Sequence, residues 1–215
     1  MSKKMDRCLI LCAGELDPKA LEAVEKPEEC YIIAADGGYL HARRLGLRPD
    51  LILGDFDSAP RPADTDVELF PAEKDDTDCM LAVKEGIARG CRDFIILGGT
   101  GGRLDHTIAN IQTLEYLCDR GLGNLLADAR HRITVLRDTS RTFPRFKGYL
   151  SIFALSPRGE GVTLTGMKYP LKEAVLTRGF PLGVSNQITE KEGTVSIRQG
   201  TLLVIQALEP EEEEE

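Results

Sequence analysis

The sequence lacks any long apolar run, and this absence limits the kinds of protein it can encode. No stretch approaches the ~18–20 apolar residues of a membrane-spanning helix, so we predict no membrane segment. The start, Met1–Arg7, is charged and leads into neither a long apolar core nor a small-residue cleavage site, which predicts no signal peptide. No basic patch stands out either, so nucleic acid is not an expected partner.

The six cysteines do not form a single Cys-x-x-Cys pair. They occur within or beside apolar segments, as small hydrophobic residues do, at Cys8, Cys12, Cys30, Cys79, Cys91 and Cys118. This placement favours free thiols in a reduced, cytoplasmic protein over a disulfide framework or a zinc site.

Two common nucleotide-binding motifs are also absent. Gly98–Gly102 is rich in glycine, but Leu104 stands where the last glycine of Gly-x-Gly-x-x-Gly would be. There is no Gly-x-x-x-x-Gly-Lys-Ser/Thr loop. The sequence therefore carries neither the dinucleotide fingerprint nor a Walker loop.

The first part of the chain contains a regular alternation of strand and helix patterns. Strands are predicted at Cys8–Cys12, Tyr31–Ala35, Leu51–Leu53, Phe94–Leu97, Asn124–Ala127 and Arg132–Leu136. Helices are predicted at Asp17–Glu25, Tyr39–Leu45, Thr77–Arg89 and Asp105–Arg120, the last three closed by glycine. This alternation predicts an α/β fold, with a mainly parallel, Rossmann-like sheet covered by helices on both faces.

After about Thr139 the pattern changes to short β-rich runs separated by glycine and proline. The runs are Tyr149–Ala154, Gly161–Thr165, Ala174–Thr177, Gly193–Ile197 and Thr201–Ile205. We therefore predict an α/β nucleotide-binding domain at residues 1–139 and a small C-terminal antiparallel β-sandwich at residues 140–208. Residues 209–215 hold six of the glutamates behind the net charge of −8, and we expect them to be a disordered acidic tail.

Two carboxylates end the third predicted strand. Leu51–Leu53 is followed by Gly54, and Asp55 and Asp57 then point to the same side of an extended chain. The carboxyl end of a strand is where an α/β sheet places ligand groups. Two such carboxylates without a counter-charge repel each other and attract a divalent cation.

Three further polar loops repeat this arrangement, at Asp36–Gly38, Glu73–Asp78 and Gly98–His106. Their acids suit Mg²⁺, and the glycines offer backbone N–H groups to an anion at the start of a helix. Lys74 and Arg103 add cations for phosphate oxygens. Together these groups suit phosphoryl or pyrophosphoryl transfer from a nucleotide.

Each piece also has a purely structural interpretation. Thr77, Asp78 and Asp105 are residues of the kind that cap helices or begin them. Gly98–Gly102 is compatible with a flexible turn, and Asp36 before two glycines is common in turns.

The order and spacing of these loops closely resemble those of the thiamine pyrophosphokinase family. The matching segments are Ala35–Gly38, Pro49–Ser58, Lys74–Asp78, Gly98–His106, Gly183–Gln187 and Gly200–Ile205. The resemblance covers nearly the whole chain and implies transfer of the diphosphate of ATP to the hydroxyl of thiamine, with release of AMP. It also implies a homodimer that binds thiamine at the subunit junction.

By this resemblance, Asp55, Asp57 and Asp78 hold Mg²⁺, with Asp105 nearby and Arg103 offsetting charge. The implied ATP contacts are Asp36, Gly37, Gly38, Lys74, Asp75, Thr77, Gly99, Thr100, Gly101, Gly102, Arg103 and His106. The implied thiamine contacts are Ser185, Asn186 and Gln187. Gln187 departs from the Glu that bacterial members often carry, and the absence of tryptophan leaves Tyr39 or a phenylalanine to stack on thiamine.

Three alternatives remain open. Leu53–Ser58 superficially resembles the Asp-x-Asp motif of haloacid-dehalogenase-type phosphatases, although that motif normally closes the first strand of its domain. A diphosphokinase for another alcohol, such as a pterin, would use a similar set of aspartates. A non-catalytic module that binds nucleotide or thiamine would share the motifs without turnover.

Overall fold

The computed structural model describes residues 6–54, 68–70 and 76–209, and the chain divides into two compact units. The first unit ends at Ala129 and the second begins at Arg130. The division predicted from the sequence lies at residue 139, beyond strand β7 (His131–Arg137). Strand β7 pairs along its length with β13 (Thr201–Leu208). Because β13 belongs to the second unit, β7 belongs to it as well.

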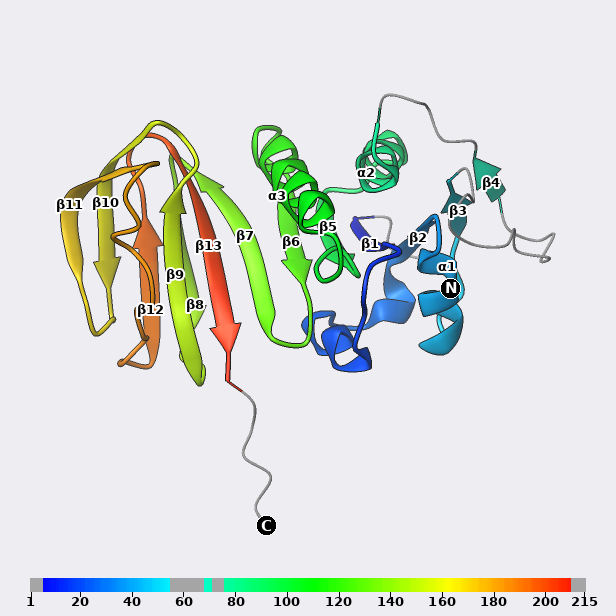
Figure 1. Ribbon diagram of the computed structural model, residues 1–215, viewed down its shortest axis with the longest axis horizontal. Helices are drawn as coiled ribbons and strands as arrows, with labels where there is room; N and C mark the ends of the chain where they lie inside the picture. Colours follow the sequence, from blue (N-terminus) through cyan, green and yellow to red (C-terminus); the bar gives the residue numbers. More distant parts are fainter. Residues whose placement is uncertain (1–5, 55–67, 71–75, 210–215) are drawn as a thin grey trace, which may run out of the picture. The chain divides into compact units, whose positions relative to one another are not determined.

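A parallel sheet forms the centre of the first unit (Figure 1). Its strands run in the order β4-β3-β2-β1-β5-β6, and each neighbouring pair is parallel. The strands are β1 (Arg7–Leu11), β2 (Tyr31–Ala35), β3 (Leu51–Leu53), β4 (Glu68–Phe70), β5 (Asp93–Leu97) and β6 (Gly123–Ala127). The central strands are nearly continuous apolar runs because both of their faces are covered.

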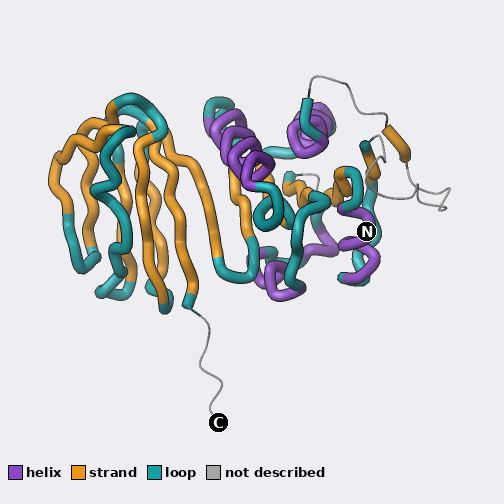
Figure 2. Tube along the Cα trace, viewed as in Figure 1, coloured by secondary structure: helices purple, strands orange, loops and turns teal. Residues whose placement is uncertain are grey.

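Helices cover this sheet on both faces (Figure 2). On one face, Leu9 and Leu11 of β1 share a core with Ala20 of the 3-10 helix η1 (Pro18–Ala23) and Ala42 of α1 (Gly38–Arg44). On the other face, Gly86 of α2 (Asp78–Ala88) contacts β1 and β5, since a Cβ built there would lie 2.6 Å from the Phe94 ring. The remaining helices are η2 (Pro27–Glu29) and α3 (Leu104–Cys118). The predicted α/β class is confirmed.

Local sequence signals set several helix ends. The Thr77 hydroxyl accepts a hydrogen bond from the Met80 N–H at 3.2 Å and so caps α2, and Asp17 caps η1 by accepting from Lys19 N at 2.9 Å. Gly90, with φ of +92°, follows α2 as expected of a terminating glycine. In α3 the N-cap position is occupied by Arg103, and Asp105 lies in the first turn.

The second unit is a β-sandwich of two antiparallel layers. One layer has the order β7-β13-β9 and the other β11-β10-β12-β8. Its further strands are β8 (Ser140–Pro144), β9 (Gly148–Ala154), β10 (Arg158–Thr165), β11 (Leu171–Thr177) and β12 (Glu192–Ser196). Ile152, Leu164, Val195 and Leu202 contribute to one shared core, which confirms the predicted sandwich architecture. Strands β4 and β8 were not foreseen.

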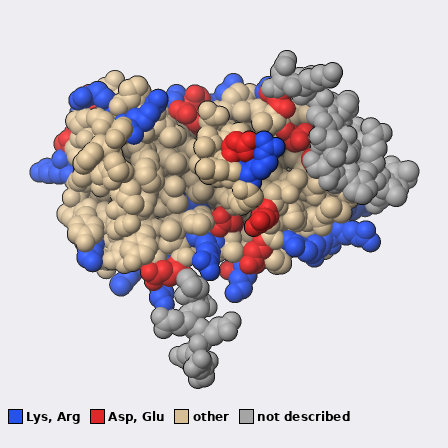
Figure 3. Space-filling model, in the orientation of Figure 1, with Lys and Arg blue, Asp and Glu red and all other residues tan. Residues whose placement is uncertain are grey.

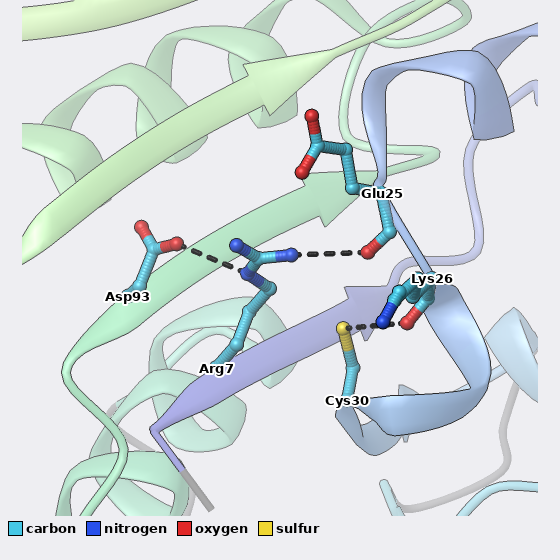
Figure 4. A network of polar contacts seen from close by, with 5 residues as sticks. All are labelled: Arg7, Glu25, Lys26, Cys30 and Asp93. Atoms are coloured by element: carbon cyan, nitrogen blue, oxygen red, sulfur yellow. Dashed lines mark hydrogen bonds and ion pairs between the residues drawn. The ribbon is translucent and has the colours of Figure 1, made fainter. Parts of the chain in front are cut away.

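Arg7 joins three segments at the amino ends of β1 and β5 (Figure 4). Its guanidinium contacts Asp93 Oδ2 at 3.3 Å and donates to the Glu25 carbonyl at 3.0 Å. The Cys30 thiol donates to the Lys26 carbonyl at 3.8 Å in the same region. These contacts fix the segment before β2 at the amino edge of the sheet, which is the edge opposite the carboxyl ends of the strands.

Replacing Arg7 by methionine should lower the free energy of unfolding by about 1 kcal/mol or less, because the side chain is 39% exposed and water screens its pair. Circular dichroism during urea unfolding measures this change in a protein without tryptophan. A loss of about 3 kcal/mol, as for a buried ion pair, would contradict this expectation.

Charged side chains of both signs lie on the surface of the protein. On the face drawn in Figure 3, Lys and Arg side chains are interspersed with Asp and Glu. Within the part of the chain that the structure describes, no helix is long and apolar enough to cross a membrane.

Candidate functional site at the carboxyl ends of the strands

Four neighbouring strands of the first unit end at the same edge of the sheet. β3, β2, β1 and β5 are adjacent and parallel, so the segments after Leu53, Ala35, Leu11 and Leu97 meet there. In open α/β sheets ligands bind in the crevice outside these ends. Three of the four predicted polar loops begin at this edge.

Asp36 occupies a strained and buried position directly after β2. Its φ of +48° lies in the left-handed region, and the residue is only 5% exposed. Its Oδ1 atom is buried and has no hydrogen-bond partner among the described residues. A buried carboxylate oxygen in this condition costs free energy unless a donor or a cation compensates it. The site therefore fits a cationic or hydrogen-bonding ligand.

Gly54 brings the ends of β2 and β3 into contact. The Asp36 N–H donates to the Leu53 carbonyl at 2.7 Å. Gly54 has φ of +143°, and a Cβ there would lie 2.9 Å from the Asp36 Cα, which is too close for any side chain. Gly54 therefore packs directly against the backbone and Cβ of Asp36.

The predicted glycine loop is held by several elements and is not a free turn. The Gly98 carbonyl accepts from Gly14 N at 2.9 Å, and the Gly99 carbonyl accepts from Asn110 Nδ2 at 2.8 Å. The Thr100 hydroxyl donates to Asp128 Oδ2 at 2.8 Å. Gly98, Gly101 and Gly102 all have positive φ, which explains why the loop is so rich in glycine.

Arg103 and Asp105 form an exposed ion pair at the start of α3. The guanidinium contacts the carboxylate through two hydrogen bonds, at 3.1 and 2.5 Å. This hydrogen bonding lowers the pKa of Asp105 and raises the pKa of Arg103. The Asp105 carboxylate also accepts from the His106 N–H at 3.0 Å. Asp105 thus orients Arg103, which keeps further N–H donors because a guanidinium has five.

The start of α2 reaches the same edge through a buried thiol contact. Cys79 lies near Cys12, the residue that follows β1, and this neighbouring thiol together with burial raises the pKa of Cys79 well above its usual value. Asp78 precedes Cys79 and Thr77 caps the helix, so both predicted residues are placed beside the β1 end. The six cysteines are free thiols.

Several predicted site residues lie outside the described part of the chain, namely Asp55, Asp57, Lys74 and Asp75. Of the three predicted metal ligands, only Asp78 is described. Within residues 6–54, 68–70 and 76–209, no group of three acidic, His or Cys side chains is placed to hold a metal ion. The metal-ligand assignment therefore stays a prediction.

In the second unit, the segment Ser185–Gln187 contains a residue with positive φ and a buried amide that hydrogen bonds to the backbone. Ser185 has φ of +60°, and its N–H donates to Ser151 Oγ at 3.0 Å. Asn186 is 4% exposed, and its side chain binds both backbone groups of Tyr169, accepting from N at 3.0 Å and donating to O at 2.7 Å. The Asn186 amide therefore holds the backbone of Tyr169, a residue that is 58% exposed.

Three residues that are not predicted from the sequence contact the candidate site residues, namely Tyr169, Asn110 and Asp128. Asp128 directly follows β6, so the rule that identified Asp36 after β2 would also have identified it. Asn110 and Tyr169 carry no such signal, because their contacts join segments that the sequence does not show to be neighbours.

Comparison with known proteins finds matches over both units. Residues 25–123 match the family model described as thiamin pyrophosphokinase, catalytic domain, and residues 130–202 match thiamin pyrophosphokinase, vitamin B1 binding domain. Thiamine pyrophosphokinase of Bacillus subtilis (strain 168) is 31% identical over 184 residues, which is 81% of this chain and 86% of that protein.

Solved structures give the same result. A crystal structure of thiamine pyrophosphokinase from Bacillus subtilis has a TM-score of 0.87 at 28% identity, covering 95% of this chain and all of that one. A crystal structure of thiamin pyrophosphokinase from Geobacillus thermodenitrificans has a TM-score of 0.85 at 30% identity, covering 94% of this chain and 98% of that one.

Proposed function

Because this chain belongs to the thiamine pyrophosphokinase family, we propose that it transfers the diphosphate of ATP to the hydroxyl of thiamine, forming thiamine diphosphate and AMP. The observation that carries this proposal is the succession of two family matches, catalytic and vitamin B1-binding, along most of one chain. The protein is accordingly a diphosphotransferase. No observation favours the phosphatase, the pterin enzyme or the non-catalytic module.

Product analysis by mass spectrometry tests this proposal directly. The protein is incubated with ATP, Mg²⁺ and thiamine, and a matched reaction omits thiamine. AMP and thiamine diphosphate in equal amounts are the expected products. Release of inorganic phosphate that does not depend on thiamine would support a phosphatase. Binding of ATP without any product would mean either that the acceptor is another alcohol or that the protein is a non-catalytic binding module.

The ATP site would be built on the carboxyl edge of the first unit's sheet. The glycine loop from Gly98 to Gly102 would offer backbone N–H groups to the phosphates, as glycine loops before helices do. Arg103, Lys74 and His106 would contact phosphate oxygens, with Arg103 oriented by Asp105. The segment Asp36–Gly38 and the residues Asp75 and Thr77 would complete the site.

The same edge would hold Mg²⁺ through Asp55, Asp57 and Asp78. The supporting observation is the buried Oδ1 of Asp36, which lacks a partner among the described residues and belongs to a residue in contact with Gly54. Bound Mg²⁺ would neutralise charge on the phosphate oxygens. The carboxylates would position it, and Asp105 would act nearby through Arg103.

The chemistry requires in-line attack on the β-phosphorus of ATP. A new bond forms between the thiamine hydroxyl oxygen and the β-phosphorus, and the bond from that phosphorus to the oxygen of AMP breaks. One carboxylate at the edge accepts the hydroxyl proton. Arg103 and Lys74 stabilise the negative charge that develops on the transferred group.

Thiamine would be bound by the second unit through Ser185, Gln187 and the exposed ring of Tyr169. Asn186 would act by fixing the Tyr169 backbone, since its amide is already used there. In a protein without tryptophan, Tyr169 is an exposed aromatic side chain held beside this segment, and Lys168 Nζ lies over its ring, 5.5 Å from the centroid. The other face of the ring would stack on thiamine.

Replacing Tyr169 by alanine should raise the Michaelis constant for thiamine about fivefold, because a stacking contact is worth about 1 kcal/mol. Steady-state kinetics with each substrate varied in turn measures this effect. Tyr169→Phe should stay near wild type, and the constant for ATP should not change. Val175→Ala, which also removes exposed apolar surface from this unit, serves as the control. An equal effect of Val175→Ala would argue against stacking.

We further propose a cytoplasmic homodimer with thiamine at the subunit junction. In the second unit, Phe180, Leu182 and Val184 are exposed apolar side chains on the approach to Ser185. Exposed apolar clusters of this kind mark interaction surfaces. Light scattering after size exclusion at micromolar concentration distinguishes a dimer from a monomer.

A further inference from the structure

The hydroxyl of Thr100 donates a hydrogen bond to another side chain of the protein. Thr100 is 9% exposed, and its Oγ1 donates to Asp128 Oδ2 at 2.8 Å. Asp128 follows β6, and β6 pairs with β5, which leads into the glycine loop. A carboxylate can only accept hydrogen bonds and a hydroxyl has one hydrogen, so this hydrogen is not available for a phosphate oxygen.

Three consecutive loop residues are each bound by a different element. Gly98 is tied to Gly14 after β1, Gly99 to Asn110 of α3, and Thr100 to Asp128 after β6. Asn110 is 6% exposed, so its bond to Gly99 is protected from water. The loop is therefore shaped before any ligand arrives.

These ties also set the direction of the loop's N–H groups. In a trans peptide the C=O and the following N–H point in opposite directions. Because the carbonyls of Gly98 and Gly99 point toward Gly14 and Asn110, the N–H groups of Gly99 and Thr100 point away from them. Fixed donors of this kind bind an anion without the entropy cost of ordering a loop.

We propose that Asp128 is a positioning residue of the nucleotide site, acting through the Thr100 hydroxyl to hold the glycine loop with its backbone donors facing the phosphates. This inference rests on one part of the proposed function, namely that the glycine loop binds the phosphates of ATP. Asp128 does not contact the nucleotide. Its negative charge opposes phosphate binding, so its contribution comes from the hydrogen bond and not from the charge.

The separation of charge from hydrogen bonding makes the proposal testable. Asp128→Asn keeps an acceptor for Thr100 and removes the charge, whereas Asp128→Ala removes both. Thr100→Ser keeps the hydroxyl, and Thr100→Val removes it with little change in shape. Thr113→Val is a matched control, since the hydroxyl of that buried threonine donates to Ala109 within α3 at 3.1 Å.

The experiment is calorimetric titration of each full-length variant with a non-hydrolysable ATP analogue and Mg²⁺, and separately with thiamine. Thr100→Val and Asp128→Ala should each weaken binding of the analogue about tenfold. Thr100→Ser and Asp128→Asn should stay within about threefold of wild type. The double variant Thr100→Val/Asp128→Ala should be no weaker than either single variant, because both remove the same hydrogen bond. Thiamine binding should stay unchanged throughout.

Several results with the variants would overturn the proposal. They are normal analogue binding by Thr100→Val, equal losses in Asp128→Asn and Asp128→Ala, additive losses in the double variant, and the same loss in Thr113→Val. A wild-type protein that does not bind the analogue would overturn it as well. If the variants bind the ATP analogue as expected but the wild-type protein forms no thiamine diphosphate, thiamine is excluded as the acceptor. The role of Asp128 would then still be supported.

Discussion

Replacing Asp57 by asparagine should lower kcat by about a thousandfold or more while the protein stays folded. Asp57 is a predicted Mg²⁺ ligand, and an amide supplies neither the charge nor the affinity of a carboxylate. Metal stabilisation of transferring phosphoryl groups is worth several kcal/mol, and about 4 kcal/mol corresponds to this factor in rate. The measurement is AMP formation at saturating ATP, thiamine and Mg²⁺, with circular dichroism as the test of folding.

Asp50→Asn is the matched control for this variant. Asp50 precedes the same strand, β3, and its carboxylate accepts from Ile32 N at 2.8 Å at the amino edge of the sheet. Asparagine keeps an acceptor there, so turnover should remain close to wild type. Near-normal turnover by Asp57→Asn would contradict the assignment of Asp57 as a metal ligand. Loss of turnover in Asp50→Asn would show that any change around β3 lowers activity.

The parallel sheet could be predicted because its sequence signals are local and consistent. Tyr31–Ala35 and Leu51–Leu53 are apolar along their whole length and begin and end where predicted. Such runs suit strands that are buried on both faces. β8 was missed for the opposite reason, since Ser140–Pro144 is largely exposed and polar and owes its strand state to its pairing with β12.

The location of the candidate site could also be predicted, since it follows from topology alone. Once strands are parallel, residues after their carboxyl ends share an edge, and Asp36 and Gly98 lie there. What the sequence could not show is which polar groups are already used inside the protein. Asn186 is predicted to contact thiamine, and its amide also hydrogen bonds to the backbone of Tyr169, a residue 17 positions away. Such non-local hydrogen bonds leave no periodic signal.

The second large effect is expected at Asp36, where asparagine should reduce kcat about a hundredfold and at the same time stabilise the protein. The loss of activity follows from removing a carboxylate at the proposed cation site. The gain in stability has two causes. An unpartnered buried carboxylate oxygen is costlier than a neutral amide, and asparagine tolerates the left-handed φ of +48° well.

A gain of about 1 kcal/mol would raise the thermal midpoint by about 2–4 °C in a protein of this size. Differential scanning calorimetry without divalent cation measures it, and Asp50→Asn, whose carboxylate already has a partner, should show no such gain. Added Mg²⁺ with an ATP analogue should stabilise wild type more than Asp36→Asn, because the variant has lost part of the site. Full activity in Asp36→Asn would place the carboxylate outside the site. A lower midpoint would mean that Asp36 Oδ1 is compensated within the protein, and the argument for a cation beside it would fail.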